Sequence, residues 1–478
     1  MTKKSYQMLS RTESLCPRCL SRIPAYYVKD GEMVYLIRHC DDHGGFQTMV
    51  WKGPPNFETW KRPKIPTSPP VTYSESYLGC PFDCGLCPAH RQHTCTALIE
   101  ITQRCNLNCP VCFASAGRND SADPDLGVIK EWFERIRDAC HPCNIQISGG
   151  EPTLRDDLPE IITLGGNMGF SFIQLNTNGI RLAGEKGYAR KLKEAGLSSV
   201  FLQFDGTEDS VYNSLRGKPL LDIKQSAIEM CGENDIGVVL VPTLVPGVNS
   251  RNIGDIIRFG LKKAPVVRGI HFQPISYFGR YPHPPTDGDR ISLPEIMTAM
   301  EEQTGGMIKA NNFRPPGCEN ARCSFHGNFI LMPDGKLKAL SCFKPPATLP
   351  AMNNGFVGDL RKPENISSSS SDYQNIAGNI EKAEDGARQA ISTVARQWAF
   401  PVISDKKCCC GTDDLDTFLS RAKQYGFTIS AMAFQDAWNI DLERLKDCCI
   451  HVMAPGGKLV PFCIYNLTSA EGKTVYRK

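Results

Sequence analysis

Short apolar runs alternate with amphipathic stretches between residues 96 and 280. The apolar runs occupy six ranges, which are 97–102, 144–148, 172–177, 199–204, 237–244 and 269–275. The segments between them, such as 125–138 and 189–195, carry apolar residues at helical spacing. Strands that alternate with helices predict βαβ units and a parallel sheet. We therefore expect an α/β fold containing a partial (β/α)6 barrel, with its chemistry at the C-terminal ends of the strands.

Cysteine-rich segments flank the predicted barrel on both sides. We expect a metal-binding unit at 1–60, a proline-rich linker with a cysteine loop at 61–95, the barrel at 96–280, a linker and cysteine-containing hairpin at 281–360, a disordered loop and helix at 361–404, and a cysteine-rich unit at 405–478. Two similar hairpin patterns, at 329–337 and 453–459, suggest duplicated cluster-binding modules. The apolar residues between 427 and 440 predict a core-facing helix, with one wall of an apolar tunnel as the alternative.

Composition narrows the class of protein. The chain has 478 residues, 41% of them hydrophobic, and a formal net charge of +3, so we expect a globular protein that does not bind nucleic acid. No apolar run approaches the ~20 residues of a membrane-spanning helix, although peripheral membrane contact stays open. The 22 cysteines are closely spaced, and the N-terminus lacks the apolar stretch of an export signal. This combination indicates metal binding in a reducing, cytoplasmic compartment.

The motif CNLNCPVC at residues 105–112 directly follows the first predicted strand. Its thiolates, from Cys105, Cys109 and Cys112, can hold three irons of a [4Fe-4S] cluster and leave the fourth iron open. The amine and carboxylate of a substrate can chelate that iron. Electron transfer into a bound sulfonium would then cleave a C–S bond and release a carbon radical that abstracts hydrogen from a C–H bond. A zinc-binding loop is the alternative that the spacing leaves open.

This loop resembles the CxxxCxxC signature of the radical S-adenosylmethionine (SAM) superfamily. Val111 departs from the family pattern, which usually has an aromatic residue before the third cysteine. The second predicted strand ends in the sequence SGGEP, whose glycines allow close backbone approach to a ligand. The resemblance implies that Gly149, Gly150 and Glu151 contact the amino group of SAM.

Polar residues end the third and fourth predicted strands. Asn176, Thr177, Gln203 and Asp205 suit the ribose hydroxyls of SAM. Arg216 resembles the arginine with which related enzymes hold the SAM carboxylate, and a plain surface arginine is the alternative.

A second CxxxCxxC loop precedes the barrel. Cys80, Cys84 and Cys87, with Cys95 as a fourth ligand, predict a closed auxiliary [4Fe-4S] cluster, with structural zinc as the alternative. Spacing alone does not separate this loop from the one at 105–112. The GGEP stretch follows only the latter at the spacing of successive barrel strands, which assigns SAM to that loop.

Further cysteines predict two more metal sites. Cys16, Cys19, Cys40 and His43 have the paired spacing of a tetrahedral mononuclear site, which suits zinc better than iron. The later part of the chain has more thiols than one cluster needs, so we expect at least one further [4Fe-4S] cluster. Its ligands, which the sequence does not decide, are drawn from a group that includes Cys318, Cys323, Cys342 and Cys463.

The chain as a whole resembles one family more narrowly. The cysteine-rich head, the motif GCPFDCGLC at 79–87 and the motif FCIYN at 462–466 are similar to the tetraether lipid synthase group, whose members have often been labelled dihydropterin methyltransferases. The resemblance implies hydrogen abstraction from isoprenoid lipid chains, coupling of two carbons, and a reductant such as ferredoxin or flavodoxin. A radical SAM methyltransferase acting on a pterin or another small molecule is the second hypothesis. The third is a multi-cluster electron-transfer protein without chemistry of its own.

Overall fold

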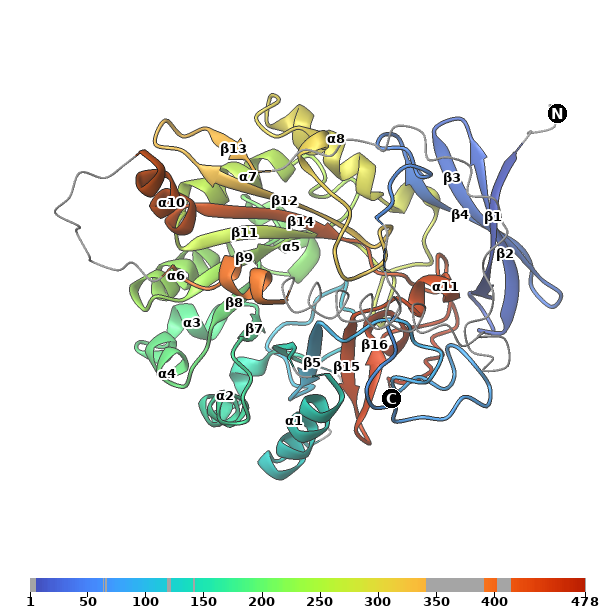
Figure 1. Cartoon of the computed structure of the whole chain (residues 1–478), viewed down its shortest axis with the longest axis horizontal. Coiled ribbons are helices and arrows are strands. Elements are labelled where there is room, and N and C mark those ends of the chain that lie inside the picture. Colours follow the sequence, from blue (N-terminus) through green and yellow to red (C-terminus); the bar gives the residue numbers. More distant parts are fainter. Residues whose placement is uncertain are drawn as a thin grey trace, which may run out of the picture.

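The computed structural model describes residues 6–62, 64, 67–117, 122–140, 142–340, 391–401 and 414–477. A large mixed sheet with helices packed against it forms the centre of the molecule, and a small four-stranded sheet lies at one side (Figure 1). No helix in these ranges is long and apolar enough to cross a membrane. The loop and helix predicted at 361–404 fall mostly outside the described ranges.

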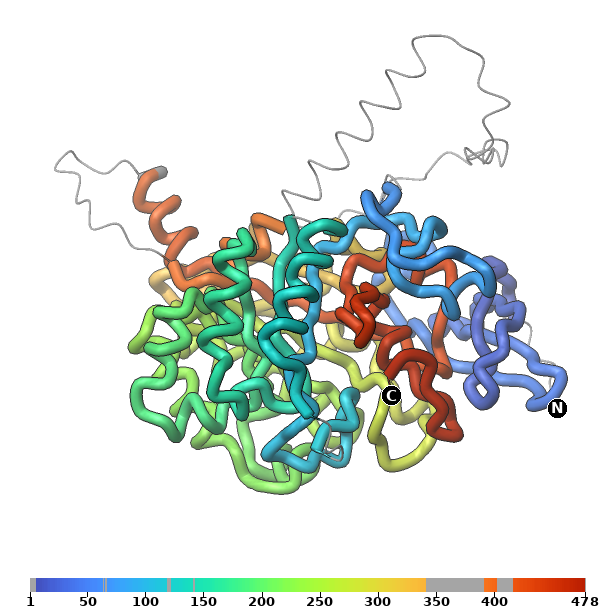
Figure 2. The backbone as a smooth tube through the Cα atoms, turned by 90° about the horizontal axis from the view of Figure 1, so that it is seen from below, coloured from blue at the N-terminus to red at the C-terminus, as the bar shows by residue number. Residues whose placement is uncertain are grey.

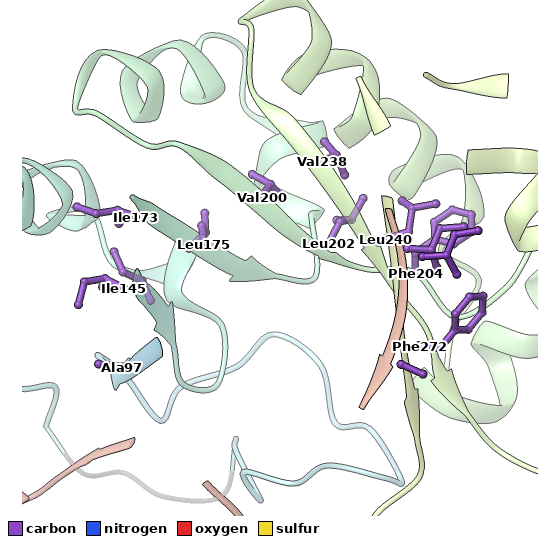
Figure 3. Packing of buried hydrophobic residues seen from close by; sticks show 14 of the residues in the cluster. Ala97, Ile145, Ile173, Leu175, Val200, Leu202, Phe204, Val238, Leu240 and Phe272 are labelled. Carbon is purple, nitrogen blue, oxygen red and sulfur yellow. The ribbon is translucent and has the colours of Figure 1, made fainter. Parts of the chain in front are cut away.

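Parallel strands form the core of the large sheet. They are β5 (Thr96–Glu100), β6 (Asn144–Ser148), β7 (Ile173–Thr177), β8 (Ser199–Gln203), β9 (Gly237–Val241) and β11 (Val267–Pro274), and the short β10 (Thr243–Leu244) pairs with β11. Each lies within or beside one of the six predicted apolar runs, and they pair in chain order from β5 to β11. Their side chains form one continuous apolar core, which Figure 3 shows from Ala97 on β5 to Phe272 on β11. The predicted α/β fold with a partial (β/α)6 barrel is confirmed.

Helices connect successive strands and cover the sheet. They are α1 (Leu126–Cys140), α2 (Leu158–Asn167), α3 (Ile180–Gly184), α4 (Tyr188–Glu194), α5 (Asp209–Arg216), α6 (Leu221–Glu233) and α7 (Ile253–Lys262). In α1, residues three and four positions apart are buried because they face the sheet, and the buried set is Ile129, Trp132, Phe133, Ile136, Ala139 and Cys140. Further helices are α8 (Leu293–Gln303), α10 (Asp414–Gln424), α11 (Leu442–Leu445) and α12 (Phe462–Tyr465), and residues 391–398 are also helical.

The last part of the chain extends the barrel sheet at both edges. Strand β14 (Gly426–Met432) pairs in parallel with β11, and β15 (Ile450–Ala454) pairs in parallel with β5. Each edge then carries a hairpin: β12 (Ser324–Leu331) with β13 (Leu337–Ala339) beside β14, and β16 (Lys458–Pro461) beside β15. The helix expected at the start of the 427–440 segment was wrong, because Phe427, Ile429 and Ala431 alternate along a strand that is paired on both sides.

The N-terminal sheet contains β1 (Gln7–Leu15), β2 (Arg22–Asp30), β3 (Met33–Cys40) and β4 (Gly44–Lys52), paired antiparallel in chain order. Figure 2 shows it beside the C-terminal part of the chain. Buried hydrogen bonds join the two, since the Thr12 hydroxyl donates to Asp441 at 2.7 Å and the Thr48 hydroxyl donates to the carbonyl of Trp438 at 2.6 Å. The two ends of the sequence therefore form one packed region against the barrel.

Candidate functional site

The three thiols of the 105–112 loop lie together beyond the carboxyl end of β5. Cys109 is buried, and Cys105 and Cys112 pack beside it in a small cluster that also contains Leu107 and Tyr212. Burial raises the pKa of the Cys105 thiol to about 11, and the nearby charges of Glu151 and the other two cysteines raise it further. Binding of a metal at this position must therefore displace protons from the thiols.

The two glycines after β6 bring its backbone against this loop. A Cβ atom on Gly149 would lie 2.2 Å from the carbonyl oxygen of Thr102, and one on Gly150 would lie 2.2 Å from that of Arg104. The backbone of the cluster loop occupies this space, and two hydrogen bonds join it to the strand end: Gly150 N donates to Thr102 O and Glu151 N donates to Arg104 O, both at 2.8 Å. Only glycine fits at these positions, so the cluster loop and the GGEP stretch form one rigid backbone surface.

The carboxylate of Glu151 binds to the protein itself. It is 1% exposed and accepts hydrogen bonds from Thr153 N at 3.1 Å, the Thr177 hydroxyl at 2.7 Å and Asn178 N at 2.7 Å. These partners come from the segment after β6 and from the end of β7. Glu151 therefore holds two neighbouring strand ends together.

Arg216 and Asp205 form a buried ion pair at the end of β8. The guanidinium donates to both carboxylate oxygens of Asp205 at 2.7 and 2.8 Å, and it also reaches the hydroxyl of Thr243 at 3.2 Å and the carbonyl of Val111 in the cluster loop at 3.5 Å. Burial alone would lower the pKa of Arg216, but Asp205 outweighs it and the pKa is raised. The alternative of a plain surface arginine is wrong, because Arg216 is 9% exposed and links β8, β10 and the cluster loop.

Sequence reasoning missed Lys224, which is fully buried on α6. Its ammonium donates to the carbonyl of Asn178 at 2.5 Å and to the side-chain oxygen of Gln203 at 3.2 Å. Burial lowers the pKa of Lys224 to about 7, although Asp205 opposes the shift. The signal in the sequence was a lysine at the helical spacing of the buried Ala227 and Ile228. Nearby, the side-chain oxygen of Asn176 is buried and has no hydrogen-bond partner in the described residues.

Four predicted ligands meet between β1 and β4. The ligand atoms of Cys16, Cys19, Cys40 and His43 all lie within 4.8 Å of one another, and no other such group occurs in the described parts of the chain. His43 Nδ1 is 3.6 Å from the sulfur of Cys16 and 3.5 Å from that of Cys40. Three sulfurs and one nitrogen in this arrangement match a tetrahedral zinc site.

Nine of the remaining described thiols form three groups; outside them lie Cys231 and the buried pair Cys140 and Cys143, whose sulfurs are 3.6 Å apart. Cys80 and Cys84 interact, and Cys87 lies near both. Cys95, predicted as their fourth ligand, instead interacts with Cys318 and Cys449, beside Glu319. This differs from the prediction because Cys95 immediately precedes β5 and Cys449 immediately precedes β15, and the two strands are paired.

The third thiol group consists of Cys323, Cys448 and Cys463, which lie close enough to influence one another's pKa. Burial raises the pKa of Cys448 to about 12. Arg444 donates to the sulfur of Cys323 at 3.2 Å, and Gln435 N donates to that of Cys463 at 3.2 Å. Cys342 and the run Cys408–Cys410 lie outside the described residues.

Comparisons with known proteins agree with this arrangement. A model of the radical SAM superfamily matches residues 99–260, and a model described as the HMPTM N-terminal zinc ribbon domain matches residues 8–52. The chain is 36% identical to a 7,8-dihydro-6-hydroxymethylpterin dimethyltransferase from Methanocaldococcus jannaschii, over 96% of this chain and 94% of that one. It is 31% identical to a probable GTP 3',8-cyclase from Methanothermobacter thermautotrophicus, over 38% of this chain and 58% of that one.

Solved structures with partial similarity include Streptococcus suis SuiB bound to S-adenosylmethionine. It has 15% identity and a TM-score of 0.34, and the match covers 40% of this chain and 43% of that one. Native anSMEcpe with bound AdoMet has 18% identity and a TM-score of 0.35, with 44% and 59% of the two chains covered.

Proposed function

The chain belongs to the radical SAM superfamily, in the family of the pterin dimethyltransferase from Methanocaldococcus jannaschii, and from this membership we propose that it adds methyl groups to a dihydropterin or a related polar heterocycle. One observation carries the proposal: the three thiols of the 105–112 loop and the backbone of Gly149 and Gly150 lie at one edge of the barrel sheet. The name of the relative supplies the substrate class.

The residues at this edge fit the two cofactors that define the superfamily. Together, a [4Fe-4S] cluster and SAM supply a 5'-deoxyadenosyl radical that abstracts hydrogen from a substrate carbon. We assign the cluster to Cys105, Cys109 and Cys112, because three thiols in one short loop leave one iron open. The unpartnered side-chain oxygen of Asn176 offers a hydrogen-bond acceptor at the same edge. The glycines at 149–150 let the backbone after β6 pack directly on the cluster loop, which fixes the position of the loop at this edge.

Buried polar residues of the chain then act by positioning. Glu151 fixes the ends of β6 and β7, and the Asp205–Arg216 pair ties β8 to the cluster loop through the carbonyl of Val111. Lys224 joins the end of β7 to that of β8 through Asn178 and Gln203. A preorganised set of this kind holds reacting groups in place without reorganisation during the reaction.

Coupling of apolar chains is a second candidate, supported by a group of aromatic rings beside the cluster loop. Phe113, next to Cys112, lies 5.6 Å from Phe462, measured between ring centroids, and Phe462 lies 4.3 Å from Phe434. We call these three residues the aromatic column. Such a surface suits a hydrocarbon chain and excludes water from a radical. The third hypothesis, an electron-transfer protein without chemistry, is not supported, because members of this superfamily are enzymes.

The thiol groups away from the 105–112 loop can hold auxiliary clusters, which would relay electrons to the cluster at that loop. We assign auxiliary clusters to the loop with Cys80, Cys84 and Cys87 and to the groups around Cys95 and Cys463. A low-potential reductant such as ferredoxin or flavodoxin would then deliver electrons through them.

The experiment uses anaerobically reconstituted protein with SAM and dithionite. We expect 5'-deoxyadenosine, and with 7,8-dihydro-6-hydroxymethylpterin a product heavier by one or two methyl groups. A triple variant, Cys105→Ala/Cys109→Ala/Cys112→Ala, should form neither, and iron bound elsewhere in the chain should remain. An isoprenoid lipid converted to a coupled product, with the pterin left unchanged, would favour the second candidate. Absence of 5'-deoxyadenosine from well-loaded protein would refute the whole assignment.

A further inference from the structure

A small cavity of about 50 Å³ lies at the carboxyl ends of β11 and β14, at the same edge of the sheet as the thiols of the 105–112 loop. Ile275 and Ser276, after β11, and Ala433 and Phe434, after β14, form one side of it. Strand β4 of the N-terminal sheet and the start of α8 form the other side. Phe434 of the aromatic column lines this cavity, and Arg444 and Gln435 in its wall contact Cys323 and Cys463, but the function proposed above assigns no ligand to the cavity itself.

Three guanidinium groups line the cavity, and no acidic side chain does: they belong to Arg290, Arg322 and Arg444. Asp436 neutralises the charge of Arg290: the two guanidinium nitrogens of Arg290 donate to the two carboxylate oxygens of Asp436 at 3.0 and 2.9 Å. The charge of Asp441 acts on both other arginines, although neither guanidinium forms an ion pair with it in the described residues. Three guanidinium groups therefore face two nearby carboxylates, which leaves the cavity with a net positive charge.

Arg444 has a free donor in this wall. The residue is 9% exposed, and its Nη2 donates to the carbonyl of Arg322 at 3.1 Å and to the sulfur of Cys323 at 3.2 Å. Its Nε is buried and has no hydrogen-bond partner among the residues that the structure describes. An unsatisfied donor on a buried cation is costly, which favours a ligand that accepts from it.

Arg322 has its guanidinium stacked on an aromatic ring. Its central carbon lies 3.8 Å from the centroid of Phe57 and 5.0 Å from that of Tyr27. Stacking of this kind holds the planar group in one orientation, in which it also interacts with the hydroxyl of Tyr27. Guanidinium edges match the oxygens of a phosphate or carboxylate in pairs.

The aromatic column connects this cavity to the cluster loop. Phe434 lines the cavity and contacts Phe462, which contacts Phe113 beside Cys112. A substrate whose flat or apolar part lies along these rings can place a charged group in the cavity. We propose that the cavity binds an oxyanion, a phosphate or carboxylate, carried by the substrate or present as a free ion; the assignment to the substrate rests on the proposed function.

The first test measures binding of inorganic phosphate to reconstituted full-length protein by anaerobic calorimetry. We expect saturable binding that weakens about tenfold or more in Arg322→Gln, because a charged hydrogen bond is lost. Ala433→Leu should also abolish it, because it fills the cavity and leaves every charge in place. The matched control is Arg421→Gln, since Arg421 also stacks on a ring, at 4.1 Å from Tyr425, but lies outside the cavity. If Arg322→Gln does not fold, Ala433→Leu decides the result.

The second test separates the two sources of the anion. The alcohol 7,8-dihydro-6-hydroxymethylpterin is compared with its phosphate ester, again by binding and without turnover. Tighter binding of the ester, lost in Arg322→Gln and Ala433→Leu, supports a substrate anion. Phosphate binding without any advantage of the ester supports a free ion. No saturable phosphate binding, or binding unchanged by both variants, overturns the site. Both tests measure binding and not product formation. Their results can therefore be interpreted even if the methyltransferase proposal fails.

Discussion

At the scale of single residues, Gly150 leaves no room for any side chain. We predict that Gly150→Ala abolishes 5'-deoxyadenosine formation, because its Cβ would lie 2.2 Å from the carbonyl oxygen of Arg104 and force the cluster loop away from β6. Loss of SAM binding, measured by equilibrium dialysis, should accompany the loss of activity.

Gly166→Ala is the matched control for this substitution. Gly166 lies within α2, and a Cβ there would meet nothing within 4 Å. This change should leave activity intact and raise stability by about 0.5–1 kcal/mol, through the higher helix propensity of alanine. Normal SAM binding by Gly150→Ala would show that the glycine contact is dispensable.

Lys224 makes the stability of the folded protein depend on pH. Its pKa is lowered to about 7 in the folded protein, while the unfolded chain has the ordinary value near 10.5. Between these values the unfolded state binds more protons, so this residue makes stability rise with pH from about 7 upward. We predict that the free energy of unfolding of the wild type, relative to that of Lys224→Met, rises by about 1 kcal/mol per pH unit in that window. Chemical denaturation between pH 7 and 9.5 measures it, and a flat difference would contradict the prediction.

Residue types and spacing predicted which residues can act as ligands better than they predicted which of those residues lie together. Cys105, Cys109 and Cys112 are neighbours in sequence, so their proximity in the structure follows from a short loop. Cys95 contacts Cys318 and Cys449, which are more than 200 residues away in the chain. Such a contact depends on which strands pair, and no local pattern contains that information. The pairing of Arg216 with Asp205 is local by contrast, since the two are 11 residues apart, and the sequence named both residues without pairing them.

At the scale of elements, the N-terminal sheet depends on its ligand group. Cys16, Cys40 and Ile23 form a small cluster at its metal-binding end, separate from the larger buried side chains of the sheet such as Tyr27 and Trp51. We predict that Cys19→Ser loses one equivalent of bound zinc and increases hydrogen exchange across β1–β4, because a structural metal supplies folding free energy directly.

Cys231→Ala is the control for this change, since Cys231 is a buried thiol on α6 whose raised pKa results from burial alone. It should retain the metal and the exchange pattern of the wild type. Unchanged exchange in β1–β4 of metal-free Cys19→Ser would show that packing against residues 438–441 suffices to hold the sheet.

The elements of the barrel were predictable because their periodicity is strong. All six strands and the helices at 125–138 and 189–195 were found within a few residues. The error came at β14, where Phe427, Ile429 and Met432 fit the helical spacing as well as the strand spacing over so short a segment. Pairing with β11 on one side and β12 on the other decides the outcome there, and both partners are distant in sequence.

At the scale of the whole molecule, the last residues of the chain hold the first barrel strand. Arg477 donates to Glu100 at the end of β5, at 3.0 Å, and to the carbonyl of Ala114 behind the cluster loop at 3.4 Å. Both side chains of the pair are more than nine-tenths buried. We predict that Arg477→Met lowers stability by about 3–5 kcal/mol, because it leaves the Glu100 carboxylate buried and unpaired.

The double variant Glu100→Gln/Arg477→Met should recover part of this loss, because it removes the uncompensated charge. Denaturant midpoints of the two variants measured on the reconstituted protein test the difference. Equal destabilisation of both would show that the ion pair contributes little and that Arg477 acts through its packing on Tyr465.

The placement of β15 beside β5 has a consequence for biosynthesis. The ribosome makes β5 before its outer neighbour β15 and before Arg477, because both follow it in the chain. Until these later segments have been made, β5 lacks its outer partner strand and the loop at 105–112 lacks the contact from Arg477. Iron and sulfide therefore have a more open route to the loop during this interval, which closes when β15 and Arg477 dock.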